Sequence, residues 1–375
     1  MKLFLTADNH IGSRYASHEQ AAELAQARIT AFGPMVEKAN AEACDMFIIA
    51  GDLFENTYSI PRRDMKALLG FLSAFRGTVV VLPGNHDYYD EDVKLWQSFE
   101  ELSSAFDNIL LLTQYRPYPL KVGDDDVVLY PALCRTVHSA PGENNLGWIK
   151  KQVMAEGAYH IGIAHGAVEG ETIDKEGHYF QMSRSELEGI PVDVWLIGHT
   201  HVPFPRESKE DVFSCEGRIF NAGTHVQTDV TCNTEGQCFI IELDAQKNVR
   251  AKTFLSGNLR FYRLDVELSA GRLQSKLDEV LRGLDDRSVV ELSLYGAVSA
   301  QEYEQRGEIV EAALARFLES RYQDMGLSKL ISQETIDAEF PETSFSAQLL
   351  KALIREPKEA QLVYDLLRTM KEGRT

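Results

Sequence analysis

The chain has 375 residues, 44% hydrophobic and 25% charged, which is the composition of a soluble globular protein long enough for a main domain with one or two appended domains. No apolar run approaches the roughly 20 residues of a membrane span, and the chain starts with a strand pattern instead of a signal segment, so we expect a cytoplasmic protein without a membrane association. Five scattered cysteines without a C-x-x-C pair argue against a cysteine-based zinc site and a disulfide framework.

The net charge of −19 is unevenly distributed along the chain. Residues 1–255 carry 22 basic and 36 acidic side chains, and residues 256–375 carry 16 and 21. A protein that binds DNA unaided usually has a basic surface, so this balance counts against nucleic acid as a partner of the isolated chain.

The first hundred residues alternate between strand and helix patterns, which is the signature of βαβ units. Residues 18–43 show helical periodicity, with a kink predicted at Gly33-Pro34. The other predicted elements are strands over 2–7, 45–51 and 78–81, and helices over 61–75 and 91–106.

The middle of the chain predicts a second, partly antiparallel sheet. Residues 123–126, Gly-Asp-Asp-Asp, read as a hairpin turn between two of its strands. The remaining predicted elements are strands over 108–113, 118–122, 127–133, 160–164, 192–198, 218–223 and 237–243, and a helix over 145–156. We therefore expect residues 1–255 to form an α/β domain, a two-sheet sandwich flanked by helices.

The composition and pattern change after residue 255. Residues 256–340 predict a small α+β domain, with strands at 260–268 and 288–294 and helices at 271–283 and 301–320. Residues 341–375 predict a helical hairpin over 344–371, interrupted at Pro357. Its apolar stripe either docks a partner or packs on its own domain, and the sequence gives the two equal weight.

Five apolar runs end in residue types that bind metals. Asn, Gly and Asp are also common turn residues, so one such ending alone would indicate only a tight turn. Five endings can converge, because ligands gather outside the carboxyl ends of strands in an α/β sheet. The residues are Asp8 and His10, Asp52, Asn85 with His86 and Asp87, His165, and His199 with His201.

Imidazoles and carboxylates with one amide oxygen suit Mn, Fe or Zn and argue against Ca and Cu(I). Seven plausible ligands are too many for one ion, whereas two ions can share one carboxylate. Two ions about 3.5–4 Å apart clamp a phosphate and activate a bridging water. With Asp8 and Asp52, they leave a local charge of about +2 that attracts a phosphodiester.

Five motifs in this order resemble the complete signature of calcineurin-like metallophosphoesterases. They are D-x-H (8–10), G-D (51–52), G-N-H-D (84–87), H (165) and G-H-x-H (198–201). Leu53-Phe54 and the domains that follow resemble the SbcD branch, the nuclease subunit of a double-strand-break repair complex with Mre-eleven relatives. The resemblance implies a DNA exonuclease and endonuclease for duplex ends or hairpins, using two divalent ions, most often Mn²⁺, with Mg²⁺ weaker.

The same resemblance implies partners and residue roles. The partners would be an SbcC-like SMC-family ATPase, docked on residues 341–375, and a second copy of the chain, contacted through the helices near 63–75 and 91–106. Residues 256–340 would cap the nuclease domain and contribute to DNA specificity. The resemblance assigns one ion to Asp8, His10, Asp52 and His201, a second ion to Asp52, Asn85, His165 and His199, and a catalytic role to His86, oriented by Asp87.

The chain also departs from the family pattern. Glu55 stands where some members have a histidine, which puts a substrate contact from that position in doubt. Residues 221–225 replace the usual Gly-Ser turn, and His225 is a candidate to line the site. Arg14 and Tyr15 are candidates for contact with substrate phosphate, with a solvated loop as the alternative.

Two other functions compete with the nuclease. A phosphodiesterase or phosphatase for a small molecule would use the same chemistry and is favoured by the acidic charge. A scaffold with an inactive site is disfavoured, because every ligand position is intact.

Overall fold

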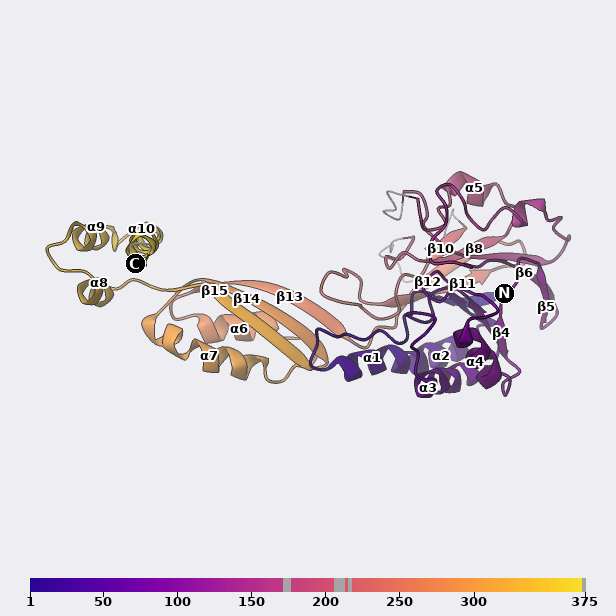
Figure 1. Ribbon diagram of the computed structural model, residues 1–375, viewed down its shortest axis with the longest axis horizontal. Helices are drawn as coiled ribbons and strands as arrows, with labels where there is room; N and C mark the ends of the chain where they lie inside the picture. The colour runs from indigo at the N-terminus through magenta and orange to yellow at the C-terminus, as the bar shows by residue number, and fades with distance from the viewer. Residues whose placement is uncertain (171–176, 206–212, 215–217, 373–375) are drawn as a thin grey trace. The chain divides into compact units, whose positions relative to one another are not determined.

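The structure is a computed structural model that describes residues 1–170, 177–205, 213–214 and 218–372. The chain divides into two compact units, Met1–Arg260 and Phe261–Thr375 (Figure 1). The first unit contains all five motifs, and each unit is described separately below.

Two sheets form the first unit, as the sequence predicted. The seven-stranded sheet has the order β4-β3-β2-β1-β11-β12-β9 and the five-stranded sheet β10-β8-β7-β6-β5. In chain order, the strands are β1 (Lys2–Thr6), β2 (Met46–Ala50), β3 (Thr78–Leu82), β4 (Ile109–Leu111), β5 (Tyr118–Val122), β6 (Asp125–Ala132), β7 (Tyr159–His165), β8 (Val194–Gly198), β9 (Phe213–Ser214), β10 (Ile219–Asn221), β11 (Gln237–Leu243) and β12 (Val249–Leu255).

The core strands are short, rich in β-branched residues and buried on both faces, as strands of parallel sheets are. β1, β2 and β3 pair in parallel, and so do β6, β7 and β8. Side chains such as Ile48, Val80, Ile163 and Leu196 fill one core between the sheets. This packing brings the carboxyl ends of both parallel sets to a common region.

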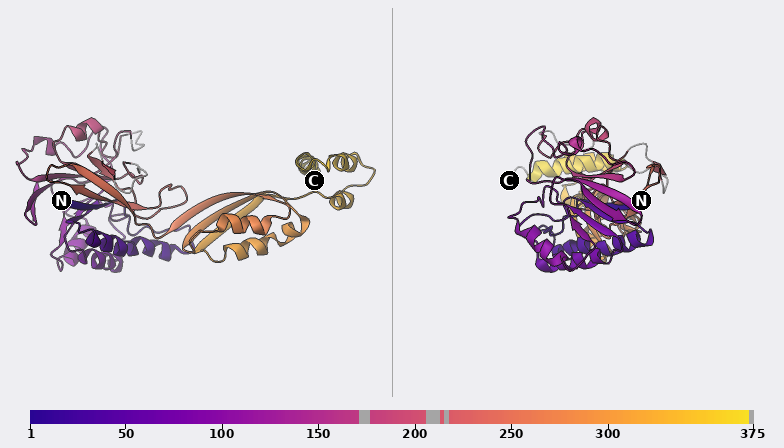
Figure 2. Two further views of the ribbon diagram at one scale, coloured as in Figure 1. Left: turned by 180° about the vertical axis from the view of Figure 1, so that it is seen from behind. Right: turned by 90° about the vertical axis from the view of Figure 1, so that its right-hand side faces the viewer.

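Four helices cover the outer face of the seven-stranded sheet (Figure 2). They are α1 (Ala21–Thr30), α2 (Phe32–Ala41), α3 (Arg62–Ser73) and α4 (Lys94–Ser103). Phe4 stacks on Phe47, which in turn contacts Phe32 of α2. The predicted helix 18–43 is divided at Ala31, two residues before the predicted kink.

The helix predicted over 145–156 is wrong, because only a turn of 3-10 helix forms there, Ile149–Lys151. Leu146 and Ile149 are buried under the five-stranded sheet, beside the short helix α5 (Arg184–Glu188). The Asn145 side chain donates to the Leu133 carbonyl at 2.6 Å. These tertiary contacts outweigh the helical periodicity of the segment.

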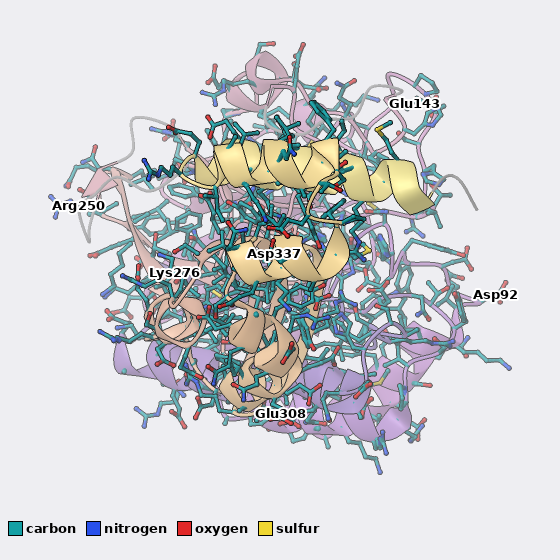
Figure 3. The ribbon with its side chains drawn as sticks, turned by 90° about the vertical axis from the view of Figure 1, so that its left-hand side faces the viewer. Asp92, Glu143, Arg250, Lys276, Glu308 and Asp337 are labelled. Atoms are coloured by element: carbon teal, nitrogen blue, oxygen red, sulfur yellow. The ribbon has the colours of Figure 1, made fainter. Side chains whose placement is uncertain are left out.

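In the second unit, a three-stranded sheet contains β13 (Arg260–Ser269), β14 (Ser288–Val298) and β15 (Glu319–Lys329). Two helices, α6 (Leu273–Leu281) and α7 (Ala300–Leu314), pack on it; Figure 3 labels Lys276 on α6 and Glu308 on α7. The predicted helix 301–320 is therefore too long. β15 was not predicted, because its residues are largely polar, with Leu327 alone buried, and lack an apolar alternation.

Three helices end the chain: α8 (Gln333–Glu339), α9 (Phe345–Leu353) and α10 (Pro357–Glu372). They have an apolar cluster of their own, and Asp337 of α8, labelled in Figure 3, pairs with Lys351 of α9 at 2.5 Å. The predicted break at Pro357 is present.

Within the described ranges, no helix combines the length and apolarity needed to cross a bilayer. The four described cysteines are free, and Cys215 lies outside the described residues.

Candidate metal centre

The residues that follow five strands lie together at one end of the sandwich. Asp8 and His10 follow β1, Asp52 follows β2, and Asn85 follows β3 in the seven-stranded sheet. The five-stranded sheet contributes His165, the last residue of β7, together with His199 and His201 after β8. Both sheets therefore contribute side chains to the same site.

Asp8, His10 and His201 form a first set, with one potential ligand atom from each lying within 4.8 Å of the others. The Nε2 atoms of His10 and His201 face one another at 3.1 Å. Two imidazole nitrogens that converge in this way can share one cation.

Asp52, His165 and His199 form a second set with the same spacing, and Asn85 joins it. The Asn85 Oδ1 atom lies 3.0 Å from both His165 Nε2 and His199 Nδ1. Asp52 Oδ2 lies 3.2 Å from His165 Nε2 and 3.9 Å from His10 Nε2. One carboxylate oxygen thus stands between the two sets, where a bridging ligand is needed.

The backbone around these residues is strained. Asp8, His10 and Asp52 adopt φ values of 50°, 46° and 50°, and His199 has φ 106°. Non-glycine residues in this region cost free energy and concentrate at functional sites. Hydrogen bonds hold the conformation: His10 N donates to Asp52 O at 2.9 Å, and His199 N donates to the Asp8 carboxylate at 2.9 Å.

Three glycines make room for the site. A Cβ on Gly51 would lie 2.9 Å from the Cβ of His165, and one on Gly84 would lie 2.9 Å from Cγ of Asp52. A Cβ on Gly198 would lie 2.9 Å from His165 Nδ1. Each glycine of the G-D, G-N-H-D and G-H-x-H motifs is therefore required by close packing.

Burial and neighbouring charges raise the pKa of one ligand candidate, Asp8, and lower the pKa values of two others, Asp52 and His201. Burial raises the pKa of Asp8 to about 7, and the neighbouring Asp52 adds to this rise. Burial acts against ionised Asp52 as well, but His165 and His10 hold its pKa well below the usual range. Burial and the charge of His10 lower the pKa of His201 to about 3, so its ring is neutral and can offer a lone pair.

The donor set fits two divalent cations. It supplies imidazole nitrogens, carboxylates and an amide oxygen, the ligand types preferred by Mn, Fe and Zn. Asp8, Asp52, Asn85 and His165 are all at most 2% exposed, so their charges and dipoles are poorly hydrated and need an internal partner. The described residues bring all seven predicted ligands into this region.

His86 follows the buried ligands but is itself exposed. Its Nδ1 lies 3.1 Å from the carbonyl of Glu55, and its ring lies edge-on to His10 with centroids 4.8 Å apart. Asp87 was expected to orient it. Instead, the Asp87 carboxylate accepts hydrogen bonds from the amides of Gly84 (2.7 Å) and Phe54 (3.0 Å), so the partner of His86 is Glu55 and Asp87 fixes the turn.

His225 does not line the site. It is fully buried, its Nε2 lies 2.8 Å from the carbonyl of Arg28, and its ring contacts Phe32. Arg14 is exposed, and Tyr15 is partly buried with its hydroxyl 3.4 Å from Arg28. Tyr15 therefore has a contact inside the protein, while a role of either residue in substrate binding stays a prediction.

Arg28 and Glu55 are the site residues that the sequence reasoning missed. Arg28 is a fully buried cation on α1. Its place on the apolar face of the predicted helix was the one feature of the sequence that indicated its burial. Its guanidinium donates to the carbonyls of Asp8, Asn9 and Val226 and to the hydroxyls of Thr224 and Tyr15.

In the sequence, Glu55 stands out only as a departure from a motif. Its Oε2 lies 3.1 Å from His10 Nδ1 and accepts a hydrogen bond from Ser13 Oγ at 2.8 Å. Burial opposes the ionised form, but the contact with His10 lowers the pKa of Glu55 to about 2. The sequence could not predict this contact between Glu55 and His10, because the two residues are brought together only by the fold.

Residues 1–203 match the family model of calcineurin-like phosphoesterases. One similar solved structure is 14% identical over 68% of this chain and 98% of its own, with a TM-score of 0.41. Another, a dimetal phosphatase from Danio rerio, is 12% identical over 60% of this chain and 87% of its own, with a TM-score of 0.32. The family match spans more than half of the chain, and this protein therefore belongs to the calcineurin-like phosphoesterases, metal-dependent hydrolases of phosphoesters.

Proposed function

We propose that this protein is a two-metal nuclease of the SbcD type, which hydrolyses phosphodiester bonds of DNA ends or hairpins during double-strand-break repair. The observation that carries the proposal is the position of Asp52 Oδ2, 3.2 Å from His165 in one ligand set and 3.9 Å from His10 in the other. The proposed ions are Mn²⁺, with Fe or Zn as alternatives and Mg²⁺ as a weaker activator.

Two ions bound here would make a water molecule acidic enough to act as the nucleophile and would neutralise charge on the phosphate. The chain's own contribution beyond ligation comes from His86. A carbonyl oxygen can only accept, so the contact with Glu55 O places a proton on His86 Nδ1 and leaves Nε2 for the substrate. His86 can therefore bind a phosphate oxygen or protonate the leaving oxygen.

The partner surface would lie on α10. Ala360 and Tyr364 of this helix are buried in the terminal cluster, whereas Leu362, Leu366 and Met370 are 70%, 61% and 54% exposed. These three residues recur every four positions and form a second, outward apolar stripe. We propose that the SMC-like ATPase docks there and supplies the basic DNA surface that a chain of net charge −19 lacks.

A second candidate is a phosphodiesterase for a small molecule. The acidic charge favours it, because such a substrate needs no extended basic surface. The 261–372 unit favours the nuclease, because a small substrate gives no reason for a further folded unit. A homodimer through α3 and α4 remains a proposal that follows from the family resemblance.

The test is hydrolysis by the full-length protein in Mn²⁺ and Mg²⁺, with and without the ATPase encoded by a neighbouring gene. Substrates are linear duplex DNA, hairpin DNA and a chromogenic phosphodiester. Manganese-dependent cleavage of DNA that the ATPase enhances is expected. Turnover of the chromogenic diester with both DNA substrates intact would reject the nuclease in favour of the second candidate.

The docking proposal is tested separately by co-purification. Replacing both Leu362 and Leu366 by Asp should abolish capture of the ATPase, because a charged side chain cannot be buried unpaired in an apolar interface. Met325→Asp makes the same change of an exposed apolar side chain to a carboxylate outside α10, on β15, and should retain capture. Normal capture by the double variant would refute the docking site.

A further inference from the structure

We propose that Glu55 is a positioning residue that fixes the ring of His10 and thereby sets the affinity of the first ligand set for its metal ion. The inference rests on the proposed two-metal function. It concerns a residue that stands where some members of the family have a histidine, and it assigns that residue to the metal centre instead of to the substrate.

The contact between the two side chains defines the tautomer of His10. Its Nδ1 is buried and lies 3.1 Å from Glu55 Oε2, within ion-pair distance but without the alignment of a hydrogen bond. An ionised carboxylate can only accept a hydrogen bond, so Nδ1 carries the proton. The lone pair of His10 is then at Nε2, the atom that faces His201 at 3.1 Å and Asp52 at 3.9 Å.

Ser13 holds the carboxylate, and backbone hydrogen bonds hold the segment that carries it. Ser13 Oγ donates to Oε2 of Glu55 at 2.8 Å. The backbone N of Glu55 donates to the carbonyl of Ile11 at 3.0 Å, and Ile11 N donates to Leu53 O at 2.9 Å. The segments that carry His10 and Glu55 are thus joined along their backbones, and the carboxylate is pre-positioned behind the imidazole.

Glu55 makes the two ligand sets unequal. The outer nitrogen of His165, Nδ1, meets the neutral carbonyl of Ala50 at 2.9 Å, whereas that of His10 meets a charged carboxylate. A carboxylate behind a ligating histidine raises the basicity of the ligand and fixes its orientation. Loss of the Glu55 side chain should therefore weaken the ion at His10 and spare the one at His165.

The backbone of Glu55 has a separate role that side-chain substitution leaves in place. Its carbonyl oxygen, 3.1 Å from Nδ1 of His86, is present whatever side chain stands at position 55. A variant of Glu55 should consequently lose metal affinity without losing the orientation of His86.

The experiment is calorimetric titration of the metal-free full-length protein with Mn²⁺ alone. Glu55→Gln preserves shape and removes charge, Glu55→Ala removes the side chain, and Glu143→Gln makes the same amide change at an exposed position (Figure 3). We expect one of two sites to weaken about 10-fold in Glu55→Gln and up to about 100-fold in Glu55→Ala. The other site, and both sites of Glu143→Gln, should stay within about twofold.

Imidazole ¹⁵N spectra of the metal-free protein, recorded above the raised pKa of His10 so that its ring is neutral, give a readout that activity does not. The His10 ring should be protonated at Nδ1 in the parent protein and lose this preference in Glu55→Ala. Turnover of Glu55→Gln should recover at saturating Mn²⁺, whereas that of His86→Ala should not.

Unchanged Mn²⁺ affinity in Glu55→Gln and Glu55→Ala, or equal weakening of both sites, would overturn the inference. Failure of the parent protein to bind Mn²⁺ would instead overturn the proposed function on which it rests. If Glu55→Ala does not fold, the isosteric Gln variant still decides the question.

Discussion

Replacing Gly84 by alanine should damage the metal centre without a change in any ligand. The added Cβ would lie 2.9 Å from Cγ of Asp52, and closer still to its Oδ1 and backbone N, where ordinary contacts begin near 3.4 Å. The neighbour includes backbone, so it cannot move away as a flexible side chain would. Either Asp52 or the 84–87 turn must shift by about half an ångström or more.

This displacement sets the expected magnitudes. Overpacking of a close-packed interior costs about 1–3 kcal/mol of the free energy of unfolding. A catalytic arrangement must be held within about 0.5 Å, so the affinity for Mn²⁺ should fall about 10-fold to 100-fold. Both sites should weaken together, because Asp52 stands between the two ligand sets.

Urea denaturation and calorimetric titration with Mn²⁺ measure the two effects. Gly147→Ala is the matched control, since an added Cβ there has no atom within 4 Å and the residue is exposed. It should retain the parent affinity. Unchanged Mn²⁺ affinity in Gly84→Ala would refute the view that this glycine is required for close approach to the Asp52 carboxylate.

Three further predictions concern separate features. His86→Ala should lower kcat for a phosphodiester about 10²-fold to 10⁴-fold with Mn²⁺ affinity unchanged, and steady-state kinetics with parent-like turnover would contradict its role. Arg28→Met leaves several buried acceptors without a donor and should cost more than about 3 kcal/mol in urea denaturation, whereas a loss under about 1 kcal/mol would show that water replaces the guanidinium. Glu42 pairs with Lys252 and Lys38, which lower its folded pKa to about 2 from 4.5. This pairing stabilises the fold at pH values above the unfolded pKa, and the stabilisation is lost as pH falls from about 4.5 towards 2. The lost free energy of unfolding is on the order of 1 kcal/mol after solvent screening. Unfolding curves measured against pH should show that Glu42→Gln abolishes this part of the acid sensitivity.

The convergence of the ligands was predictable because it depends on topology. An apolar strand ends at His165 or shortly before Asp8, Asp52, Asn85 and His199, and parallel strands in packed sheets place such residues at one end. Strand identity was readable from β-branched apolar runs, so the positions of these side chains followed from local sequence and one general rule.

What could not be predicted depends on side-chain contacts between distant segments. Arg28 has the periodicity of a core residue, and nothing in the sequence shows that its guanidinium would meet the carbonyls of Asp8 and Val226. His225 follows a motif-like turn, yet the packing of Phe32 directs it into the core.

The failure to predict strand β15 has a related cause. Its residues 319–329 are largely polar and become a strand because they pair in parallel with β14. Backbone pairing of this kind leaves no apolar alternation in the sequence, so periodicity alone assigned the start of the strand to the preceding helix.

Because the ligands come from both sheets, the metal centre affects how firmly the two sheets of the sandwich are held together. One half of the centre follows β1, β2 and β3 of one sheet, and the other half follows β7 and β8 of the other sheet. Each bound cation would therefore crosslink the two sheets at the end where the ligands lie. Chelation would then remove one connection between the two sheets, which remain joined there by apolar packing and by hydrogen bonds such as that from His199 N to the Asp8 carboxylate. Hydrogen exchange at this rim, measured without substrate, should respond to the loss of metal before that of helices α1–α4 does.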